Sequence, residues 1–223
     1  MFERMISLIG KDKFTKLQTY NVLIVGIGGV GGYALEALAR SGIINISIID
    51  DDKIEISNLN RQIISSNDNI GLIKVDVAKE RVLKINPDLN VHTFNENLNK
   101  DNIDAVLENK YDYIIDACDT VETKVLIIEK SLKYKYKFIS CMGTANKTNP
   151  ALLSITELAK TNNDPIAKIL RKRVKELKIN KKIPVVSSSE TPIASKELGT
   201  NSYIPGIAGL LCASYVINDI TKK

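Results

Sequence analysis

Short apolar runs alternate along this chain with longer segments of helical periodicity. Five such runs stand out, and in chain order they are NVLIVG (21–26), ISIID (46–50), VHTF (91–94), YIIDAC (113–118) and KFISCM (137–142). A continuous apolar run is typical of a central parallel strand that helices cover on both faces. Strands that alternate with helices predict a Rossmann-like, doubly wound, mostly parallel α/β sheet.

The segments between these runs have the spacing of amphipathic helices. Gly42 is expected to end the first of them as a C-cap, and Asn86 precedes a proline, which disfavours helical geometry and ends another. The expected helices cover residues 33–40, 72–85, 102–108 and 121–134, after a short helical piece within residues 1–19.

The pattern changes after Gly143. The elements expected there are, in chain order, a strand at 151–156, a basic helix at 165–179, a strand at 184–188 and an apolar helix packed on the core at 206–220. We therefore divide the chain into a main domain, residues 1–145, and a C-terminal extension, residues 146–223. The extension is expected to pack on the same domain and to add strands and helices to it.

The bulk composition is that of an ordinary soluble protein. The chain has 223 residues, of which 44% are hydrophobic and 26% charged, and no apolar run is long enough to span a membrane. The first residues carry charges where a signal peptide has an apolar core. We expect a cytoplasmic protein with no membrane span. The net charge of +5 is a mild indication of a polyanionic partner.

Cysteine and histidine chemistry adds little. Cys118, Cys141 and Cys212 form no CxxC pair, so neither a Cys-rich zinc site nor a disulfide scaffold is expected. Each is interpreted as a buried apolar thiol. His92 is the single histidine and lies in an alternating strand, so a mechanism that rests on a histidine triad is disfavoured.

A glycine-rich loop follows the first strand and opens the next helix. Gly26, Gly28, Gly29 and Gly31 let the backbone approach phosphates and leave N–H groups free at a helix N-terminus, where the helix dipole favours anions. Asp50 ends the next strand, where a carboxylate can bind a ribose hydroxyl. These features predict a nucleotide site, and they fit NAD, FAD and ATP alike.

The charged residues beyond Asp50 favour a triphosphate. Arg61, in SNLNRQ, and Lys74, in GLIKVD, offer two cations to one nucleotide. A dinucleotide pyrophosphate is held mainly by backbone N–H groups, whereas a triphosphate under cleavage builds up charge on its leaving pyrophosphate. Asp116 and Asp119 end the YIIDAC strand, at the sheet edge where ligands bind, and a carboxylate there can hold Mg²⁺.

Five motifs, GxGGxG, DxD, NxNRQ, GxxK and DxxD, occur in this order between residues 26 and 119. In order and spacing they resemble the adenylating domain shared by ubiquitin-activating enzymes, molybdopterin-synthase and thiamine sulfur-carrier adenylyltransferases, and tRNA threonylcarbamoyladenosine dehydratases. The resemblance covers about residues 1–145. It implies that this part is an ATP-binding adenylating domain, with ATP and Mg²⁺ as cofactors.

The resemblance also implies a role for each matching residue. Arg61, Lys74 and Asp119 are expected to be catalytic, with Asp119 as the Mg²⁺ ligand. Arg4 matches an arginine that in this superfamily reaches the active site of the other subunit, which implies a homodimer. The residues expected to bind the nucleotide are Gly26, Gly28, Gly29, Gly31, Asp50, Asp52, Asn58, Lys74 and Lys124.

The second half of the chain resembles the tRNA dehydratase branch. The stretches that carry this resemblance are ITELAKTNNDPIAKILRKRVKEL (155–177), VVSSSETP (185–192) and IPGIAGLLCASYVINDI (204–220), and Lys124 matches a lysine of that branch. The implied reaction is ATP-dependent adenylation of the threonylcarbamoyl carboxylate of a modified adenosine in tRNA. Cyclisation with loss of AMP follows, which is a formal dehydration.

The basic helix supports tRNA as the partner. Ile166, Ile169, Leu170, Val174 and Leu177 recur at helical spacing, so most of the cations between them share the other face. A basic face suits phosphates. The cations expected to contact tRNA are Lys168, Arg171, Lys172, Lys175 and Lys178.

Two other functions stay open at this point. The first is an adenylyltransferase for a small ubiquitin-like sulfur carrier, which performs the same chemistry on a protein carboxylate. Such enzymes often carry two CxxC pairs, which this chain lacks. The second is a nucleotide-binding module without catalysis, which would bind ATP and release no AMP. The sequence also leaves open whether a sulfur-transfer or cysteine desulfurase partner assists.

Overall fold

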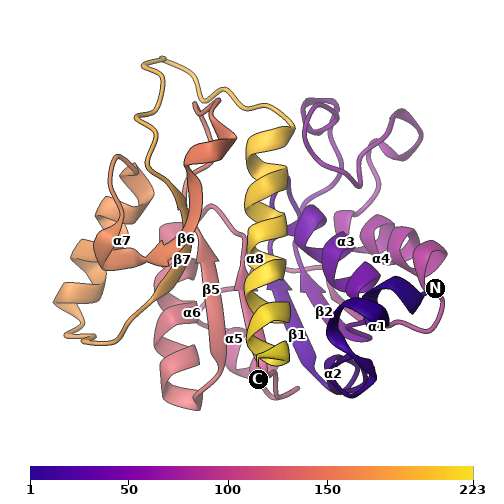
Figure 1. Ribbon diagram of the computed structural model, residues 1–223. Helices are drawn as coiled ribbons and strands as arrows, with labels where there is room; N and C mark the ends of the chain where they lie inside the picture. Colours follow the sequence, from indigo (N-terminus) through magenta and orange to yellow (C-terminus); the bar gives the residue numbers. More distant parts are fainter. Residues whose placement is uncertain (223) are drawn as a thin grey trace.

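Seven strands form a sheet in the order β3-β2-β1-β4-β5-β7-β6 in the computed structural model, which describes residues 1–222 (Figure 1). The strands are β1 (Asn21–Val25), β2 (Asn45–Ile49), β3 (Asn90–Phe94), β4 (Tyr113–Asp116), β5 (Lys137–Cys141), β6 (Leu153–Glu157) and β7 (Pro184–Ser188). Neighbouring strands pair in parallel, except that β6 is antiparallel to β7. The chain order reverses between β1 and β4, and open α/β sheets bind ligands at such a switch point.

Helices cover both faces of the sheet. They are α1 (Glu3–Ile9), α2 (Lys11–Leu17), α3 (Gly31–Ser41), α4 (Lys74–Ile85), α5 (Ile103–Leu107), α6 (Val121–Tyr134), α7 (Pro165–Glu176) and α8 (Tyr203–Thr221). Successive residues of a strand point to opposite faces, and this separates two cores. Val22 and Ile24 of β1 share a core with α2, α3, α4 and α8, whereas Leu23 and Val25 share one with α5, α6 and α7.

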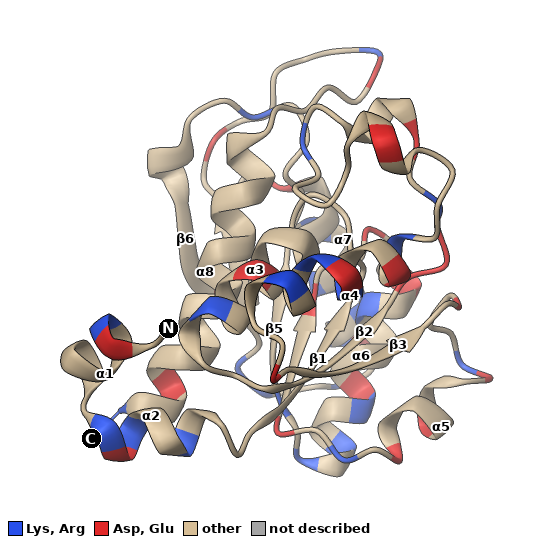
Figure 2. Ribbon diagram, turned by 90° about the vertical axis from the view of Figure 1, so that its right-hand side faces the viewer, with Lys and Arg blue, Asp and Glu red and all other residues tan. Residues whose placement is uncertain are grey.

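The predicted fold class, a Rossmann-like and mostly parallel doubly wound sheet, is confirmed. Each run that the sequence predicted as a strand lies in this sheet, with boundaries shifted by at most two residues. Charged side chains lie on the helices and loops, and the strands are almost free of them (Figure 2). The separation explains the long apolar runs, because strands buried on both faces have no position for a solvated charge.

Three elements of the extension, β6, α7 and α8, differ from the prediction at their ends. The first strand begins only at Leu153, because a 3-10 turn precedes it and Asn149 caps that turn by accepting from a backbone N–H at 3.0 Å. α7 ends at Glu176 and not at residue 179. Lys178 has a φ of 54°, in the left-handed region, which an α-helix does not contain.

α8 begins at Tyr203, before the predicted start, because Pro205 lies in its first turn, where the missing N–H has no partner to lose. α8 is long and apolar enough to cross a membrane by length and composition, with a mean hydropathy of 1.3, and it is the one such helix within residues 1–222. Half of that apolar window is buried. A Cβ at Gly209 would lie 2.2 Å from the Val30 carbonyl oxygen, so α8 packs directly on the start of α3, as a core helix does.

The sheet runs across the predicted domain boundary at residue 145. β6 and β7 come from the extension, and β7 pairs in parallel with β5. The extension therefore adds strands as well as helices to the same sheet. The division into two parts at residue 145 itself stays a prediction.

Candidate functional site

A cavity of about 710 Å³ opens where the loops that follow β1, β2, β3, β4 and β5 meet. This place is the switch point of the sheet, between β1 and β4. The predicted site residues that line the cavity are Gly26, Gly28, Gly29, Asp50, Asp52, Asn58, Arg61, Lys74 and Asp119. Three others, Arg4, Gly31 and Lys124, do not line it.

The glycines of the loop have two different roles. Gly26 has a φ of 88°, and a Cβ there would lie 2.9 Å from the Ala117 carbonyl oxygen. A Cβ at Gly31 would lie 1.8 Å from the Gly26 carbonyl oxygen. Gly31 therefore allows the chain to turn tightly. It was expected to lie beside the phosphates, but it does not line the cavity. Gly28 and Gly29 form the part of the loop that faces the cavity.

Asp50 joins the end of β2 to the glycine loop. Its carboxylate accepts hydrogen bonds from the Ile27 N–H at 2.6 Å and from the Asp52 N–H at 2.9 Å. Burial raises the pKa of Asp50, against the opposing effects of Lys74 and of these backbone donors. The carboxylate thus fixes the loop, and its contact with a ribose stays a prediction.

Lys74 is a buried cation in the cavity wall. It begins α4 and is only 4% exposed, and its Nζ lies 2.6 Å from Asp52 Oδ2 and 3.9 Å from Asp50 Oδ1. The carboxylates of Asp50, Asp51 and Asp52 lie within 4.8 Å of one another. Because two of the three face Lys74, this acidic cluster has its counter-charge, and we do not assign a metal ion to it.

Arg61 stands beside the glycine loop. It follows a 3-10 turn (Ile56–Asn58), and its Nη1 donates to the Ser57 carbonyl at 2.5 Å, which holds the guanidinium in the wall. Its Cγ would lie 3.5 Å from a Cβ at Gly29. Asn58 is buried, and its Oδ1 accepts from the backbone N–H that precedes the turn at 3.1 Å. Asn58 therefore shapes the turn that positions Arg61.

Asp119 follows β4 and is an exposed residue of the cavity wall. Within residues 1–222 its carboxylate has one hydrogen-bond donor, the neighbouring Thr120 hydroxyl at 3.3 Å, and no ion pair. A carboxylate in this state can hold a divalent cation. Asp116, the first acid of the same motif, is fully buried and does not reach the cavity.

Lys124 and Asp116 form an ion pair behind the wall, and both side chains are fully buried. Lys124 Nζ lies 3.1 Å from Asp116 Oδ1 and donates to the Cys141 carbonyl at 2.8 Å, while the Ser140 hydroxyl donates to the other Asp116 oxygen. Burial alone would lower the pKa of Lys124, but the Asp116 carboxylate raises it well above its usual range. Lys124 therefore lies behind the cavity wall, where its ammonium group joins the ends of β4 and β5, and its contact with the nucleotide stays a prediction.

Cys118 lines the cavity, but its thiol is not activated. Burial and the Asp116 carboxylate, to which Sγ donates at 3.0 Å, raise the pKa of Cys118 well above its usual range. Cys141 and Cys212 are buried, as expected of apolar thiols. His92 is an exposed residue of β3 outside the cavity, so the prediction of an ordinary strand residue is confirmed.

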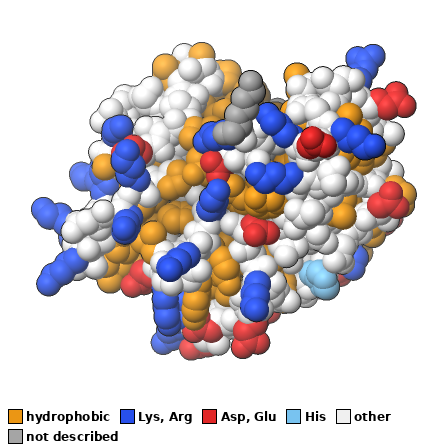
Figure 3. Space-filling model, turned by 60° about the horizontal axis from the view of Figure 1, so that its bottom comes forward, with side chains coloured by type: hydrophobic (Ala, Val, Ile, Leu, Met, Phe, Trp, Pro, Cys, Tyr) orange, Lys and Arg blue, Asp and Glu red, His pale blue; other side chains and the backbone are white. Residues whose placement is uncertain are grey.

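Arg4 is an exposed residue of α1 and lies outside the cavity of its own chain. α1 packs on α2, and α2 packs on α8, near both ends of the chain (Figure 1). Figure 3 shows the underside of the molecule, where apolar side chains lie between scattered lysines and arginines. The predicted action of Arg4 on the site of another subunit stays a prediction.

The rest of the cavity lining comes from later segments of the chain, in residues that no sequence motif indicated. Its lining residues carry no charge, whereas every charged lining residue precedes residue 120. We call the side lined by residues before 120 the charged wall. We call the other side the neutral wall, and its residues are Cys141, Met142, Gly143, Thr144, Ala145, Ile166, Leu198, Thr200 and Pro205.

The cations predicted to contact tRNA lie on α7 or just beyond it, outside the cavity. Arg171 is half-buried and donates from Nη1 to the Thr161 carbonyl at 3.0 Å. The apolar stripe is narrower than predicted, because Ile169 and Leu177 are exposed. The other four predicted cations, Lys168, Lys172, Lys175 and Lys178, are exposed.

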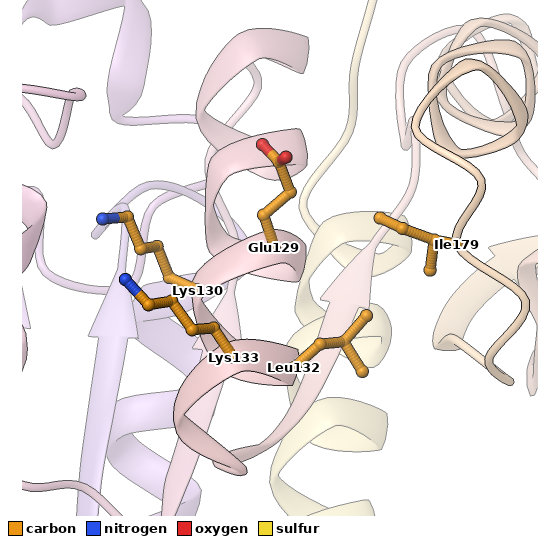
Figure 4. A pocket seen from close by; sticks show the side chains of 5 residues that line it. All are labelled: Glu129, Lys130, Leu132, Lys133 and Ile179. Carbon is orange, nitrogen blue, oxygen red and sulfur yellow. The ribbon is translucent and has the colours of Figure 1, made fainter.

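A second and smaller pocket, of about 420 Å³, lies between α6 and the segment after α7 (Figure 4). Leu132 and Ile179 face each other across it, and the side chains of Lys130 and Lys133 point away from them. Lys130 pairs with Asp104 at 2.5 Å. Because no predicted site residue lines this pocket, the larger cavity is the candidate nucleotide site.

The fold and the cavity define an α/β protein that binds a nucleotide at the switch point of its sheet. Comparison with known sequences agrees with this class: the chain belongs to the ThiF family, whose sequence model matches residues 2–223. It is 35% identical to the tRNA threonylcarbamoyladenosine dehydratase of Bacillus subtilis (strain 168), over 99% of this chain and 94% of that protein.

Solved structures give the same relationship. Crystal structures of the Escherichia coli tRNA N6-threonylcarbamoyladenosine dehydratase TcdA, in complex with ATP and with AMP, match this chain with TM-scores of 0.94 and 0.93 at 32% identity. The match covers 98% and 97% of this chain, and 93% and 92% of those chains. Sequence and structure therefore point to the same branch of the family.

Proposed function

We propose that this chain is an ATP-dependent tRNA threonylcarbamoyladenosine dehydratase. The observation that carries the proposal is its similarity to dehydratases of that name over nearly the whole length, in sequence and in structure. The charged wall agrees, because it combines a glycine loop with cations and a free carboxylate, as cleavage of a triphosphate requires.

The reaction has two steps. In the first, an oxygen of the threonylcarbamoyl carboxylate bonds to the α-phosphorus of ATP, and pyrophosphate leaves. In the second, the carbamoyl group closes on the activated carbonyl, the bond to AMP breaks and one proton is released. Adenylation is needed because a carboxylate is a poor electrophile with a poor leaving group. The enzyme mainly positions the reactants and neutralises charge, so no side-chain nucleophile is required.

The charged wall supplies what the first step needs. The backbone N–H groups at Gly28 and Gly29, together with the N-terminus of α3, face the phosphates. Arg61 and Lys74 neutralise the charge that builds up on the leaving pyrophosphate. Asp50, which is already fixed by two backbone donors, accepts a ribose hydroxyl.

Mg²⁺ is expected at Asp119. The residue fits the ion, because its carboxylate lies in the cavity wall and only the Thr120 hydroxyl donates to it within the described chain. Mg²⁺ prefers one or two carboxylates combined with phosphate oxygens and water. Bound there, the ion would neutralise charge on the pyrophosphate, and the part played by Asp119 is to hold it.

The protein is further inferred to act as a homodimer in which Arg4 completes the partner's site. The support is that Arg4 is exposed and remote from the cavity of its own chain. Mixing an Arg4→Ala chain with an Asp119→Ala chain tests this. Random exchange should restore about one quarter of wild-type activity, since half of the dimers are mixed and each has one intact site. Activity no higher than that of the separate variants, after confirmed exchange, would refute it.

Nucleoside mass analysis of tRNA from cells that lack this protein tests the function directly. We expect threonylcarbamoyladenosine to remain and the cyclised form, lighter by one water, to disappear. In vitro, the pure protein should release AMP with modified tRNA. AMP release with a Gly-Gly carrier protein and none with tRNA would favour the carrier adenylyltransferase. ATP binding without any AMP release would leave only a binding module.

The remaining expectations belong to this proposal as well. The exposed cations of α7 offer phosphate contacts to the tRNA. A cytoplasmic location and a sulfur-transfer or cysteine desulfurase partner stay predictions.

A further inference from the structure

The neutral wall lines the part of the cavity that has no role in the steps described so far. We propose that the neutral wall binds the modified nucleoside itself, with the base lying on Leu198. This inference rests on the proposed function and names where its substrate binds.

The reaction decides which side of the cavity is left for the substrate. ATP requires the glycine loop, Arg61 and Lys74, which all belong to the charged wall. The carboxylate must reach the α-phosphate with its reacting atoms close to contact, so the nucleoside has to occupy the part of the same cavity that ATP leaves free. Apart from that carboxylate, its base and threonyl group are uncharged. A wall without charged residues suits such a ligand, because it leaves no buried charge unpaired.

Leu198 is the residue of the neutral wall that most needs a ligand. It lines the cavity and yet is 84% exposed. An apolar side chain in this state gains free energy when a ligand covers it. A nucleobase has a wide face that can cover a leucine, and its polar groups lie on its edges, where water or Thr200 can reach them.

The loop that carries Leu198 is fixed although it is exposed. Asn146 accepts from the Gly199 N–H through Oδ1 at 2.6 Å, and its own N–H donates to the Gly199 carbonyl at 2.8 Å. Asn60 Nδ2 donates to the Thr200 carbonyl at 3.1 Å, which ties the loop to the charged wall. Figure 1 shows this loop crossing the top of the molecule from β7 to α8. Leu198 is therefore held in place before a ligand arrives, which lowers the cost of binding.

A buried ion pair joins the three segments of the neutral wall. Lys147 Nζ donates to the Gly143 carbonyl at 2.7 Å and to Asp164 Oδ2 at 2.8 Å. Asp164 Oδ1 caps α7 by accepting from the Ala167 N–H at 2.9 Å, and the Lys147 carbonyl accepts from the Asn201 side chain at 2.8 Å. One lysine thus connects the loop after β5, the start of α7 and the loop before α8. These hydrogen bonds fix the positions of the three segments relative to one another.

Substitution of Leu198 tests the inference. Leu198→Ala should raise the KM for modified tRNA about 10-fold, as expected from the loss of most of a covered leucine, with ATP affinity unchanged. Leu198→Phe should keep the KM near wild type, because a ring also offers a face to the base. Ile193→Ala is the matched control, since Ile193 is 54% exposed in the same loop and does not line the cavity; it should change neither quantity.

The free modified nucleoside separates this contact from contacts with the rest of the RNA. Its binding to the full chain, measured by calorimetry with a non-hydrolysable ATP analogue present, should weaken about 10-fold in Leu198→Ala. A normal KM and a normal nucleoside affinity in this variant, with an active wild type, would overturn the inference and leave the proposed function standing. A wild type that releases no AMP with modified tRNA would overturn the proposed function instead.

Discussion

On the charged wall of the cavity, Asp50, Arg61 and Lys74 are each held by residues that also precede residue 120. Lys74 pairs with Asp52, and Asp50 accepts from the Ile27 N–H of the adjacent loop. The neutral wall carries none of the sequence motifs, and Lys147 joins its three segments, which are distant from one another in the sequence. The charged wall carries the residues proposed to bind ATP. The neutral wall is the part proposed to bind the modified nucleoside, so ATP binding and substrate selectivity are expected to depend on different residues.

The strongest test of the charged wall is Asp119→Ala. We expect AMP formation to fall about 100-fold or more, because the pyrophosphate loses the ion that neutralises it. The melting temperature should change little, since Asp119 is exposed. Asp119→Asn keeps the shape without the charge and should be equally inactive. Near-normal AMP production by either folded variant would show that the charged wall works without this carboxylate.

Lys124→Met separates the charged wall from the structure behind it. The change leaves Asp116 buried without its partner, so the free energy of unfolding should fall by about 3 kcal/mol or more. Urea unfolding measures this loss, and adding Asp116→Leu should recover much of it, because an apolar pair then replaces the ion pair. Unchanged stability together with weaker ATP binding would mean that Lys124 contacts the nucleotide after all.

Lys74→Met makes the same change within the charged wall. We expect it to lower ATP affinity more, and stability less, than Lys124→Met. ATP affinity should fall about 10-fold, the value of one charge-assisted contact, as measured by calorimetry. Stability should fall less than in Lys124→Met, because Asp52, the nearer partner at 2.6 Å, is exposed and stays hydrated, while Asp50, whose side chain is mostly buried, lies 3.9 Å away and keeps its two backbone donors. Equal losses of stability in the two variants would contradict the distinction between Lys74, which lines the cavity, and Lys124, which stabilises the structure behind it.

The smallest effect is expected outside both walls, on α7. Replacing Arg171, Lys172 and Lys175 by glutamate should raise the KM for tRNA a few-fold and flatten the log–log salt dependence of its binding by about two units. Two units are expected and not three, because the Arg171 guanidinium is already engaged by Thr161. ATP binding should be unchanged. Identical affinities and salt slopes for variant and wild type would remove α7 from the tRNA site.

The charged wall could be predicted from the sequence better than the neutral wall, because its residues belong to recognisable motifs. Gly28, Arg61 and Asp119 could be found in the sequence because a triphosphate needs those residue types at the ends of successive strands. Ile166 and Leu198 could not, since apolar residues occur everywhere and only the folded chain brings these two together. The burial of Lys124 could not be predicted either, because a lysine on a helix usually faces water and nothing local shows that a buried aspartate lies beside it.

α8 comes after every other wall element in the chain, and this order has a consequence for synthesis. Pro205 lies in the cavity wall, where it would be 3.1 Å from a Cβ at Gly29, and Gly209 packs on the Val30 carbonyl. During synthesis, all of the nucleotide-binding motifs therefore leave the ribosome before α8 is available to complete the wall of the nucleotide site. Because domains fold as units, we expect that a chain without α8 does not turn over ATP. Only chains that include α8 would then activate carboxylates.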